Sequence, residues 1–253
     1  MKLNNNVLFF FLFTICLTTV NSQNKIIRVA VYDDNGGGGR GSDNVELSLS
    51  DDTTFFTKRV SADEIRLGVL NTFDVVVQAG GSGSKQAKTL EESGVDSIRQ
   101  FVNRGGGYLG ICAGAYLSTV EYRWSLGILN ATVIDREHWN RGGGVVKIRL
   151  TPKGKLFFNA TEDTISLNYN QGPLLAQADK PNLQAYQELA VFETEIAENG
   201  ALEGIMVGLT AIAQGEFGEG RVIAISPHPE KSPELQYMIS TSVKWCAKRD
   251  RAD

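Results

Sequence analysis

Apolar runs and helix-like spacing alternate along this chain. Residues 26–31 and 222–225 are almost wholly apolar, and residues 74–78 contain the apolar run Val75-Val-Val77, which is typical of strands buried on both faces of a sheet. The segment 95–102 instead places its apolar residues at helical spacing and ends before Gly105, so it predicts an amphipathic helix. Strands that alternate with helices predict an α/β fold, a three-layer sandwich in which a mostly parallel sheet is covered on both faces.

Further strand-like segments extend this pattern. Residues 55–60 predict a second strand early in the chain. Residues 128–195 are richer in strand-like pieces, such as 145–150 and 189–192. We expect this middle stretch to add strands, antiparallel ones among them, near an edge of the sheet.

The N-terminus has the pattern of a signal peptide. Its apolar run, residues 7–20, is shorter than the about 20 residues of a membrane span. Small residues precede Gln23, so we predict a signal peptide over residues 1–22 and one α/β domain over residues 23–253. This predicts a protein that is secreted or lies in the secretory lumen (the periplasm or the exterior in a bacterium). An uncleaved N-terminal anchor is the alternative, and after cleavage no membrane association is expected.

Charge and cysteine content reduce the number of functional classes to which the chain could belong. The net charge is −4, and no basic patch indicates binding to nucleic acid or to an anionic membrane. After cleavage only Cys112 and Cys246 remain, which is no disulfide framework. Cys246 falls on the apolar face of a predicted C-terminal helix, so we expect its thiol in the core. Two sequons, at Asn130 and Asn159, predict a glycoprotein if the source is a eukaryote.

The most informative stretch is Gly110-Ile-Cys-Ala-Gly114, which lies between a predicted strand and a predicted helix. A nucleophile flanked by glycines at such a junction is typical of a nucleophile elbow. Glycines avoid backbone clashes in the sharp turn, and Cys112 is left at a helix N-terminus, where the dipole and free N–H groups favour the reactive thiolate. The alternative is a buried, inert cysteine.

A second element supplies a base. The strand at 222–225 runs into Ser226-Pro-His-Pro-Glu230, so His228 is expected beyond the C-terminal end of a strand, where α/β sheets carry their sites. Glu230 follows two residues later and is placed to orient the imidazole. Cys112, His228 and Glu230 therefore fit the roles of nucleophile, base and orienting acid. The alternative for His228 is a loop histidine that caps a backbone carbonyl group.

Two glycine-rich stretches suggest loops near this site. The GxGxxG motif at 36–41 has dinucleotide-binding spacing, but three polar residues separate it from its strand, so nucleotide binding is the weaker interpretation. Residues 80–85 lack the spacing of a phosphate-binding loop, and their N–H groups suit an oxyanion. Neither histidine has ligand-spaced partners beyond a neighbouring glutamate, so we predict no metal and no cofactor.

Five residues are candidates to line a substrate cleft. They are His138, Trp139, Tyr169, Asn170 and Gln171. The alternative is that Trp139 belongs to the core and that the polar residues form a turn.

Five sequence stretches carry a family resemblance. VVQAGG at 76–81, GGGYLGICAGAY at 105–116 and HPE at 228–230 are similar to the class I glutamine amidotransferase-like superfamily. WNRGGG at 139–144 and NYNQGP at 168–173 further resemble a domain that occurs at the N-terminus of some biotin–protein ligases and as a stand-alone protein. The resemblance covers most of the chain after residue 25 and implies a flavodoxin-like fold.

The resemblance also implies roles for residues. It makes Cys112 the nucleophile, His228 the base and Glu230 the third member, with an oxyanion hole from the N–H groups of Ala113 and of Gly80 or Gly81. Glutamine-hydrolysing members usually carry glutamine four residues after the cysteine, where this chain has Tyr116. We therefore expect Tyr116 to line the substrate site, and we predict neither glutaminase nor ligase activity from the resemblance.

Three functions are compatible with these residues. The first is a secreted cysteine hydrolase that acts on an amide bond of a small molecule or peptide. The second is a non-catalytic binding domain that keeps the pocket. The third is a glutamine amidotransferase that works with a separate partner protein, for which a secreted chain has no evident synthase.

Overall fold

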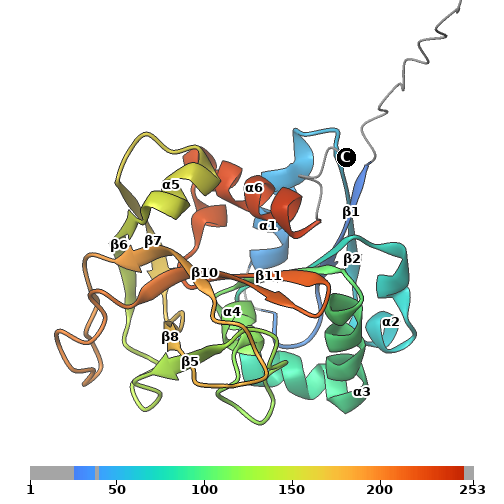
Figure 1. Cartoon of the computed structure of the whole chain (residues 1–253), viewed down its shortest axis with the longest axis horizontal. Helices are drawn as coiled ribbons and strands as arrows, with labels where there is room; N and C mark the ends of the chain where they lie inside the picture. The colour runs from blue at the N-terminus through green and yellow to red at the C-terminus, as the bar shows by residue number, and fades with distance from the viewer. Residues whose placement is uncertain (1–25, 38–39, 248–253) are drawn as a thin grey trace, which may run out of the picture.

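The computed structural model describes residues 26–37 and 40–247 (Figure 1). The predicted signal peptide and its cleavage site lie outside these residues. Within them, eleven strands form one sheet. In chain order the strands are β1 (Ile27–Tyr32), β2 (Phe55–Val60), β3 (Val75–Gln78), β4 (Gly107–Ile111), β5 (Ala131–Ile134), β6 (Gly143–Leu150), β7 (Thr164–Asn170), β8 (Leu174–Gln177), β9 (Gln187–Phe192), β10 (Thr210–Phe217) and β11 (Gly220–Ile225).

The sheet is mixed. Its main path runs β2-β1-β3-β4-β11-β10-β9-β6-β7, and β5 pairs with β8, which in turn pairs with β10. Neighbours from β2 to β11 are parallel, whereas those from β11 to β7, together with β5 and β8, are antiparallel. The α/β class is confirmed, but a mostly parallel sheet is not, because half of the main path is antiparallel.

Helices cover both faces of the sheet, as predicted (Figure 1). They are α1 (Gly41–Ser50), α2 (Ala62–Arg66), α3 (Gly83–Asn103), α4 (Ala113–Ser118), α5 (Pro152–Phe158) and α6 (Gln236–Cys246), with short 3-10 turns at Val69–Thr72, Pro229–Lys231 and Pro233–Leu235. One core contains apolar residues of α1, α5 and α6, and the other contains those of α2, α3 and α4. The sheet is therefore the middle layer of three.

The connections explain why the sheet changes from parallel to antiparallel. Parallel neighbours need a crossover, which α3 provides between β3 and β4. By contrast, β10 and β11 are joined by a tight turn with Gly218 at φ 58°. A connection this short allows only antiparallel pairing, so the sheet changes from parallel to antiparallel between β11 and β10.

Two predictions about single residues can be compared with the fold. Cys246 is fully buried on α6, as predicted. Asn130 is 6% exposed, and its amide donates to the carbonyl oxygens of Lys180 and Leu183. Asn159 is exposed at the end of α5, so of the two sequons only this one is accessible in the folded protein.

None of the helices within residues 26–37 and 40–247 has the length and apolarity needed to cross a membrane.

Candidate active site

Cys112 lies at a sharp turn between β4 and α4. Its backbone has φ 51° and ψ −99°, a conformation that is costly for a residue with a side chain. Glycines make room for the turn, because a Cβ on Gly110 would clash with the Gly114 carbonyl group and a Cβ on Gly114 would clash with that of Gln78. The Cys112 N–H donates to the Ile225 carbonyl oxygen at 2.8 Å, which ties the turn to the end of β11.

His228 lies in the loop that follows β11. Its backbone N–H donates to the Asn168 carbonyl oxygen at 2.7 Å, so β7 holds this loop in place. The imidazole Nδ1 is 2.7 Å from Glu230 Oε1, and both side chains are almost fully buried. The buried Nε2 has no hydrogen-bond partner among the described residues. The carboxylate therefore fixes the ring by one nitrogen and leaves the other available for a proton transfer.

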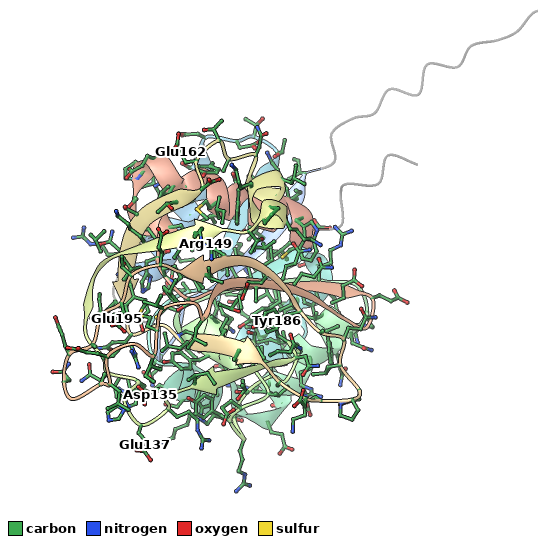
Figure 2. The ribbon with its side chains drawn as sticks, turned by 60° about the vertical axis from the view of Figure 1, so that its left-hand side comes forward. Asp135, Glu137, Arg149, Glu162, Tyr186 and Glu195 are labelled. Carbon is green, nitrogen blue, oxygen red and sulfur yellow. The ribbon has the colours of Figure 1, made fainter. Side chains whose placement is uncertain are left out.

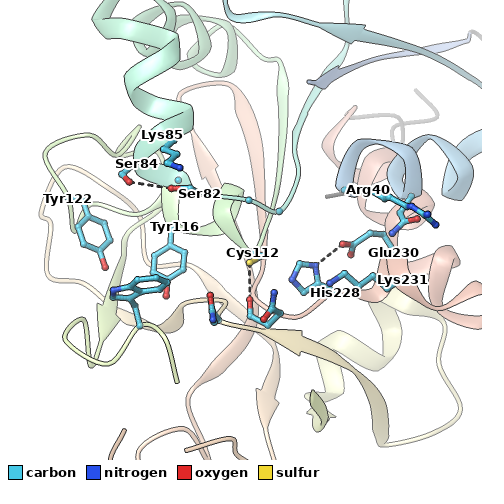
Figure 3. Close-up of a pocket in the computed structure, with 18 of the residues that line it drawn as sticks. Arg40, Ser82, Ser84, Lys85, Cys112, Tyr116, Tyr122, His228, Glu230 and Lys231 are labelled. Carbon is cyan, nitrogen blue, oxygen red and sulfur yellow. Dashed lines mark hydrogen bonds and ion pairs between the residues drawn. The ribbon is translucent and has the colours of Figure 1, made fainter. Parts of the chain in front are cut away.

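Cys112 and His228 face each other in the pocket wall (Figure 3), and Gly80 lies against both. A Cβ added to Gly80 would lie 3.0 Å from His228 Cε1 and 3.9 Å from Cys112 Cβ. A larger residue at Gly80 would therefore press on the imidazole. The glycine keeps the space beside the thiol open.

The surroundings of His228 favour its charged form. Burial disfavours a charged imidazole and lowers the pKa of His228, but the neighbouring Cys112 and the Glu230 carboxylate oppose this effect and outweigh it. The pKa of His228 is raised from 6.5 to about 9. The ring is thus protonated at neutral pH, and a cysteine beside a cationic histidine is in the arrangement that activates a thiol.

The turn after β7 covers the thiol. Cys112 Sγ donates to the Asn170 carbonyl oxygen at 3.4 Å, and Cys112 is only 6% exposed. Gln171 has a positive φ of 61°, and a Cβ on Gly172 would clash with the Ser226 carbonyl group. The turn is therefore packed tightly against the loop that carries His228.

The three predicted oxyanion donors lie on the other side of Cys112. Gly80 and Gly81 follow β3, and Gly81 adopts φ 142° where it bridges to Gly37 of the first glycine-rich loop. Ala113 is the first residue of α4, and the first N–H groups of a helix have no partner inside it. Gly36 and Gly37 thus hold the 80–81 turn, since the Ser82 N–H also donates to the Gly36 carbonyl oxygen at 2.8 Å.

A pocket of about 1050 Å³ opens in front of Cys112. Eight of the predicted site residues line it, together with Gln171. The eight are Gly80, Gly81, Cys112, Tyr116, Trp139, Asn170, His228 and Glu230. Trp139 is 55% exposed, so it belongs to this pocket and not to the core.

Two residues expected in the cleft lie elsewhere. The Tyr169 side chain points into the core, where its hydroxyl donates to the Gly172 carbonyl oxygen at 2.8 Å and its ring meets Phe192 edge-on. Side chains alternate along β7, so Tyr169 faces inward while its neighbour Asn170 faces the pocket. His138 is not among the pocket residues, because its Nδ1 is bound to Asp135 at 2.6 Å.

Asp135 is the centre of a separate charged cluster. Its second carboxylate oxygen accepts from Arg141, whose side chain is 2% exposed. Figure 2 shows Asp135 and Glu137 together at one end of the molecule, far from Glu162 at the opposite end. Arg141 also donates to the Ile196 carbonyl oxygen at 3.4 Å, so the cluster fixes the loop that presents Trp139. Within the described residues, no group of three or more histidine, cysteine or acidic side chains is arranged to hold a metal ion.

Sequence reasoning did not single out the basic and aromatic side chains that line the rest of the pocket. Four are basic and two are aromatic: Arg40, Lys85, Arg136, Lys231, Tyr122 and Trp124. The two aromatic rings stack with centroids 4.5 Å apart and an angle of 8° between their planes. Tyr116, Tyr122 and Trp124 are closely spaced in and just after α4, and this spacing was a local sequence signal for an aromatic side of the pocket. The basic residues come from four separate segments, and no sequence pattern links them.

One family matches in sequence. Residues 28–141 match the family described as "Biotin-protein ligase, N terminal", a region that includes Gly80 and Cys112 and ends before His228. No curated protein sequence matches the chain significantly.

Solved structures match in fold. A putative ThuA-like protein from Bacteroides uniformis covers 90% of this chain and 93% of its own, with 10% identity and a TM-score of 0.62. A glutamine amidotransferase from Thermotoga maritima covers 88% of this chain and 98% of its own, with 12% identity and a TM-score of 0.55.

A larger enzyme contains a similar unit. For a β-galactosidase from Bacillus circulans, the match covers 87% of this chain and 31% of that one, with 13% identity and a TM-score of 0.53. This chain therefore spans about a third of that enzyme. Likenesses at such identities show the fold alone. The sequence match confirms the predicted resemblance to the biotin–protein ligase N-terminal domain, and the solved structures show that the chain shares the fold of a glutamine amidotransferase.

Proposed function

We propose that this chain, which has a biotin–protein ligase N-terminal-like region and an amidotransferase-like fold, is a cysteine hydrolase of amide bonds. One observation carries the proposal. Cys112 occupies a positive-φ turn beside His228, whose Nδ1 lies 2.7 Å from Glu230, in the wall of a large pocket. A nucleophile, a base and a group that orients the base are the parts that acyl transfer needs.

The reaction follows from these positions. The Cys112 thiolate attacks the carbonyl carbon of the amide and forms a C–S bond, and the carbonyl oxygen takes the negative charge. The N–H groups of Gly80, Gly81 and Ala113 are the candidate donors to that oxyanion, and one such donor contributes on the order of a hundredfold in rate. His228 then gives its Nε2 proton to the leaving nitrogen as the C–N bond breaks.

Water completes the cycle. It attacks the thioester carbon and gives its proton to His228, after which the C–S bond breaks and the carboxylic acid leaves. Cys112 returns as the thiolate beside the protonated His228. Glu230 keeps the ring in the orientation that serves both steps.

Acylation by p-nitrophenyl acetate tests the proposal without knowledge of the natural substrate. We expect a burst of one p-nitrophenol per chain and an acetyl thioester on the peptide that contains Cys112. Cys112→Ala should abolish both, and His228→Ala should slow the burst by about a hundredfold or more, the usual scale of general-base catalysis. A parent protein that is not acylated at Cys112, or a burst that His228→Ala leaves unchanged, would overturn the proposal.

A non-catalytic binding domain is the second candidate. It is favoured by Tyr116 in the place of the glutamine and by the Asn170 carbonyl group that covers the thiol. The absence of acylation, with the pocket still able to bind small ligands, would support it.

Glutamine amidotransfer with a separate partner is the third candidate. The Thermotoga maritima structure supports its fold only. It requires release of ammonia from glutamine, and we expect none, because Tyr116 occupies the wall beside Cys112 where glutamine-hydrolysing members carry glutamine.

We also propose that residues 1–22 direct the chain into the secretory pathway. N-terminal sequencing of the exported protein should give a start near Gln23. Retention of Met1 on a membrane-bound protein would instead support an N-terminal anchor.

A further inference from the structure

The pocket around Cys112 is basic, although the chain carries a net charge of −4. Four basic side chains line it: Arg40, Lys85, Arg136 and Lys231. The single acidic residue in the lining is Glu230, which is already paired with His228. The lining therefore has an excess of positive charge that its own acidic group does not neutralise.

Three of these cations are available for a ligand. Arg136 is bound to Glu121 at 2.7 Å, whereas Arg40, Lys85 and Lys231 form no ion pair with any residue that the structure describes. All three are exposed side chains at the pocket. An exposed cation in a concave site attracts anionic ligands and can hold a carboxylate by charge-assisted hydrogen bonds.

Two of the unpaired cations lie on the opposite side of the thiol from the aromatic surface. Figure 3 shows Arg40 and Lys231 beside Glu230 and His228, on one side of Cys112. The same view places Tyr116 and Tyr122 on the other side, together with Lys85. The rings of Tyr116 and Tyr122 are 6.1 Å apart, and Tyr122 stacks on Trp124, so this side is a continuous aromatic wall.

The reaction determines which half of a bound amide lies on each side of Cys112. His228 has to protonate the leaving nitrogen, so the amine half of an amide lies on the side of His228. That is the side of Arg40 and Lys231. The acyl half then points the other way, toward the Tyr116, Tyr122 and Trp124 wall, which suits a flat apolar group.

We infer that the substrates are aromatic N-acyl amino acids, amides with a flat apolar acyl group and a carboxylate on the amine side. This inference rests on the proposed hydrolase function and names its substrate class. Benzoylglycine is the simplest example. Water would be consumed, the amide C–N bond would break, and benzoic acid and glycine would be released, with the glycine carboxylate held by Arg40 and Lys231.

A matched pair of compounds tests the inference. Benzoylglycine and N-methylbenzamide differ only by the carboxylate. We expect kcat/KM to be on the order of a hundredfold higher for benzoylglycine, because hydrogen bonds to charged groups contribute at this scale. In the double variant Arg40→Gln/Lys231→Gln, the ratio of kcat/KM for benzoylglycine to that for N-methylbenzamide should fall most of the way to one. Lys231→Arg should retain it, and Lys153→Gln, an exposed lysine on α5 outside the pocket, is the matched control.

Binding to Cys112→Ala separates this inference from the proposed function. Titration calorimetry with the two compounds measures recognition without turnover. We expect benzoylglycine to bind about tenfold or more tightly than the neutral amide, and Arg40→Gln/Lys231→Gln to remove this difference. If that result is found but the parent protein hydrolyses neither compound, recognition of the carboxylate is supported and only the hydrolase proposal fails. If the two compounds bind and react equally, or if neither binds or reacts while p-nitrophenyl acetate still acylates Cys112, the inferred substrate class is wrong and the hydrolase proposal is unaffected.

Discussion

Each end of β4 has a cysteine beside it, and the two cysteines have different surroundings. Cys246, from α6, packs at the amino end, where its Sγ donates to the Tyr108 carbonyl oxygen at 3.3 Å and its Cβ lies 2.7 Å from where a Cβ on Gly107 would stand. Cys112 directly follows the carboxyl end. Both thiols are buried, so burial alone does not distinguish a candidate nucleophile from a core residue.

The difference comes from the neighbouring strand ends. Strands β3, β4 and β11 run parallel, so their carboxyl ends meet at one edge of the sheet. Gly80 follows β3, Cys112 follows β4 and His228 follows β11, which brings three distant segments together. Cys246 is carried by a helix that packs on the sheet, and its thiol lies in the apolar core, where it donates to a backbone carbonyl oxygen. Parallel pairing of these three strands is therefore what places Cys112, and not Cys246, beside a histidine and a glycine turn.

The largest expected difference between the two cysteines is their rate of alkylation. Iodoacetamide at neutral pH should modify Cys112 about a hundredfold or more faster than Cys246, because Cys112 lines a pocket while Cys246 reacts only when the α6 region opens. Peptide mapping of a time course measures both rates in one sample. Equal or reversed rates would remove Cys112 as a nucleophile.

The next effect compares the two histidines. His228→Ala should slow alkylation of Cys112 by about a hundredfold, because its imidazole is the group placed to activate the thiol. His138→Ala should leave the rate nearly unchanged, because His138 is bound to Asp135 outside the pocket. Circular dichroism of both variants is the control for folding. If both label like the parent, Cys112 has no working base, and the binding domain becomes the better interpretation.

The next prediction concerns how the free energy of unfolding depends on pH. The pKa of His228 is raised to about 9 in the fold and returns to about 6.5 on unfolding. A raised folded pKa stabilises the fold fully below pH 6.5, and this contribution is lost as the pH rises through 9. It is on the order of 3 kcal/mol. The free energy of unfolding from urea titrations should therefore fall between pH 6 and 9 by more in the parent than in His228→Gln. Parallel curves would show that the charged pair does not form.

The local sequence was sufficient for the parts of the site that a short pattern encodes. The glycines around Cys112 and the prolines around His228 specify turns by steric rules, and strands 26–31, 74–78 and 222–225 were found within a residue or two. α1 was missed because only a few of its residues, such as Val45 and Leu49, are apolar and buried. The antiparallel half was underestimated because strand direction depends on partners that are distant in sequence.

The basic side of the pocket could not be predicted from the sequence. Arg40 precedes α1 and Lys231 lies in a turn after β11, almost two hundred residues later. Only the fold brings them to the same side of Cys112. Tyr169 is a residue that the sequence placed wrongly. Its position in a family-like motif predicted a place in the substrate cleft, but side chains alternate along β7, so Tyr169 faces the core.

The smallest expected effect concerns Glu230. Its Oε1 lies 2.7 Å from His228 Nδ1, and it orients the ring without reaching the substrate. Glu230→Gln keeps the shape and a polar contact and removes the charge, so the Cys112 alkylation rate should fall only about tenfold, less than in His228→Ala. The loss should depend on pH: without the carboxylate the pKa of His228 falls, so the cationic partner of the thiolate is lost at a lower pH. A pH profile of alkylation from 5 to 10 measures this, and a profile identical to that of the parent would show that Glu230 does not act on the imidazole.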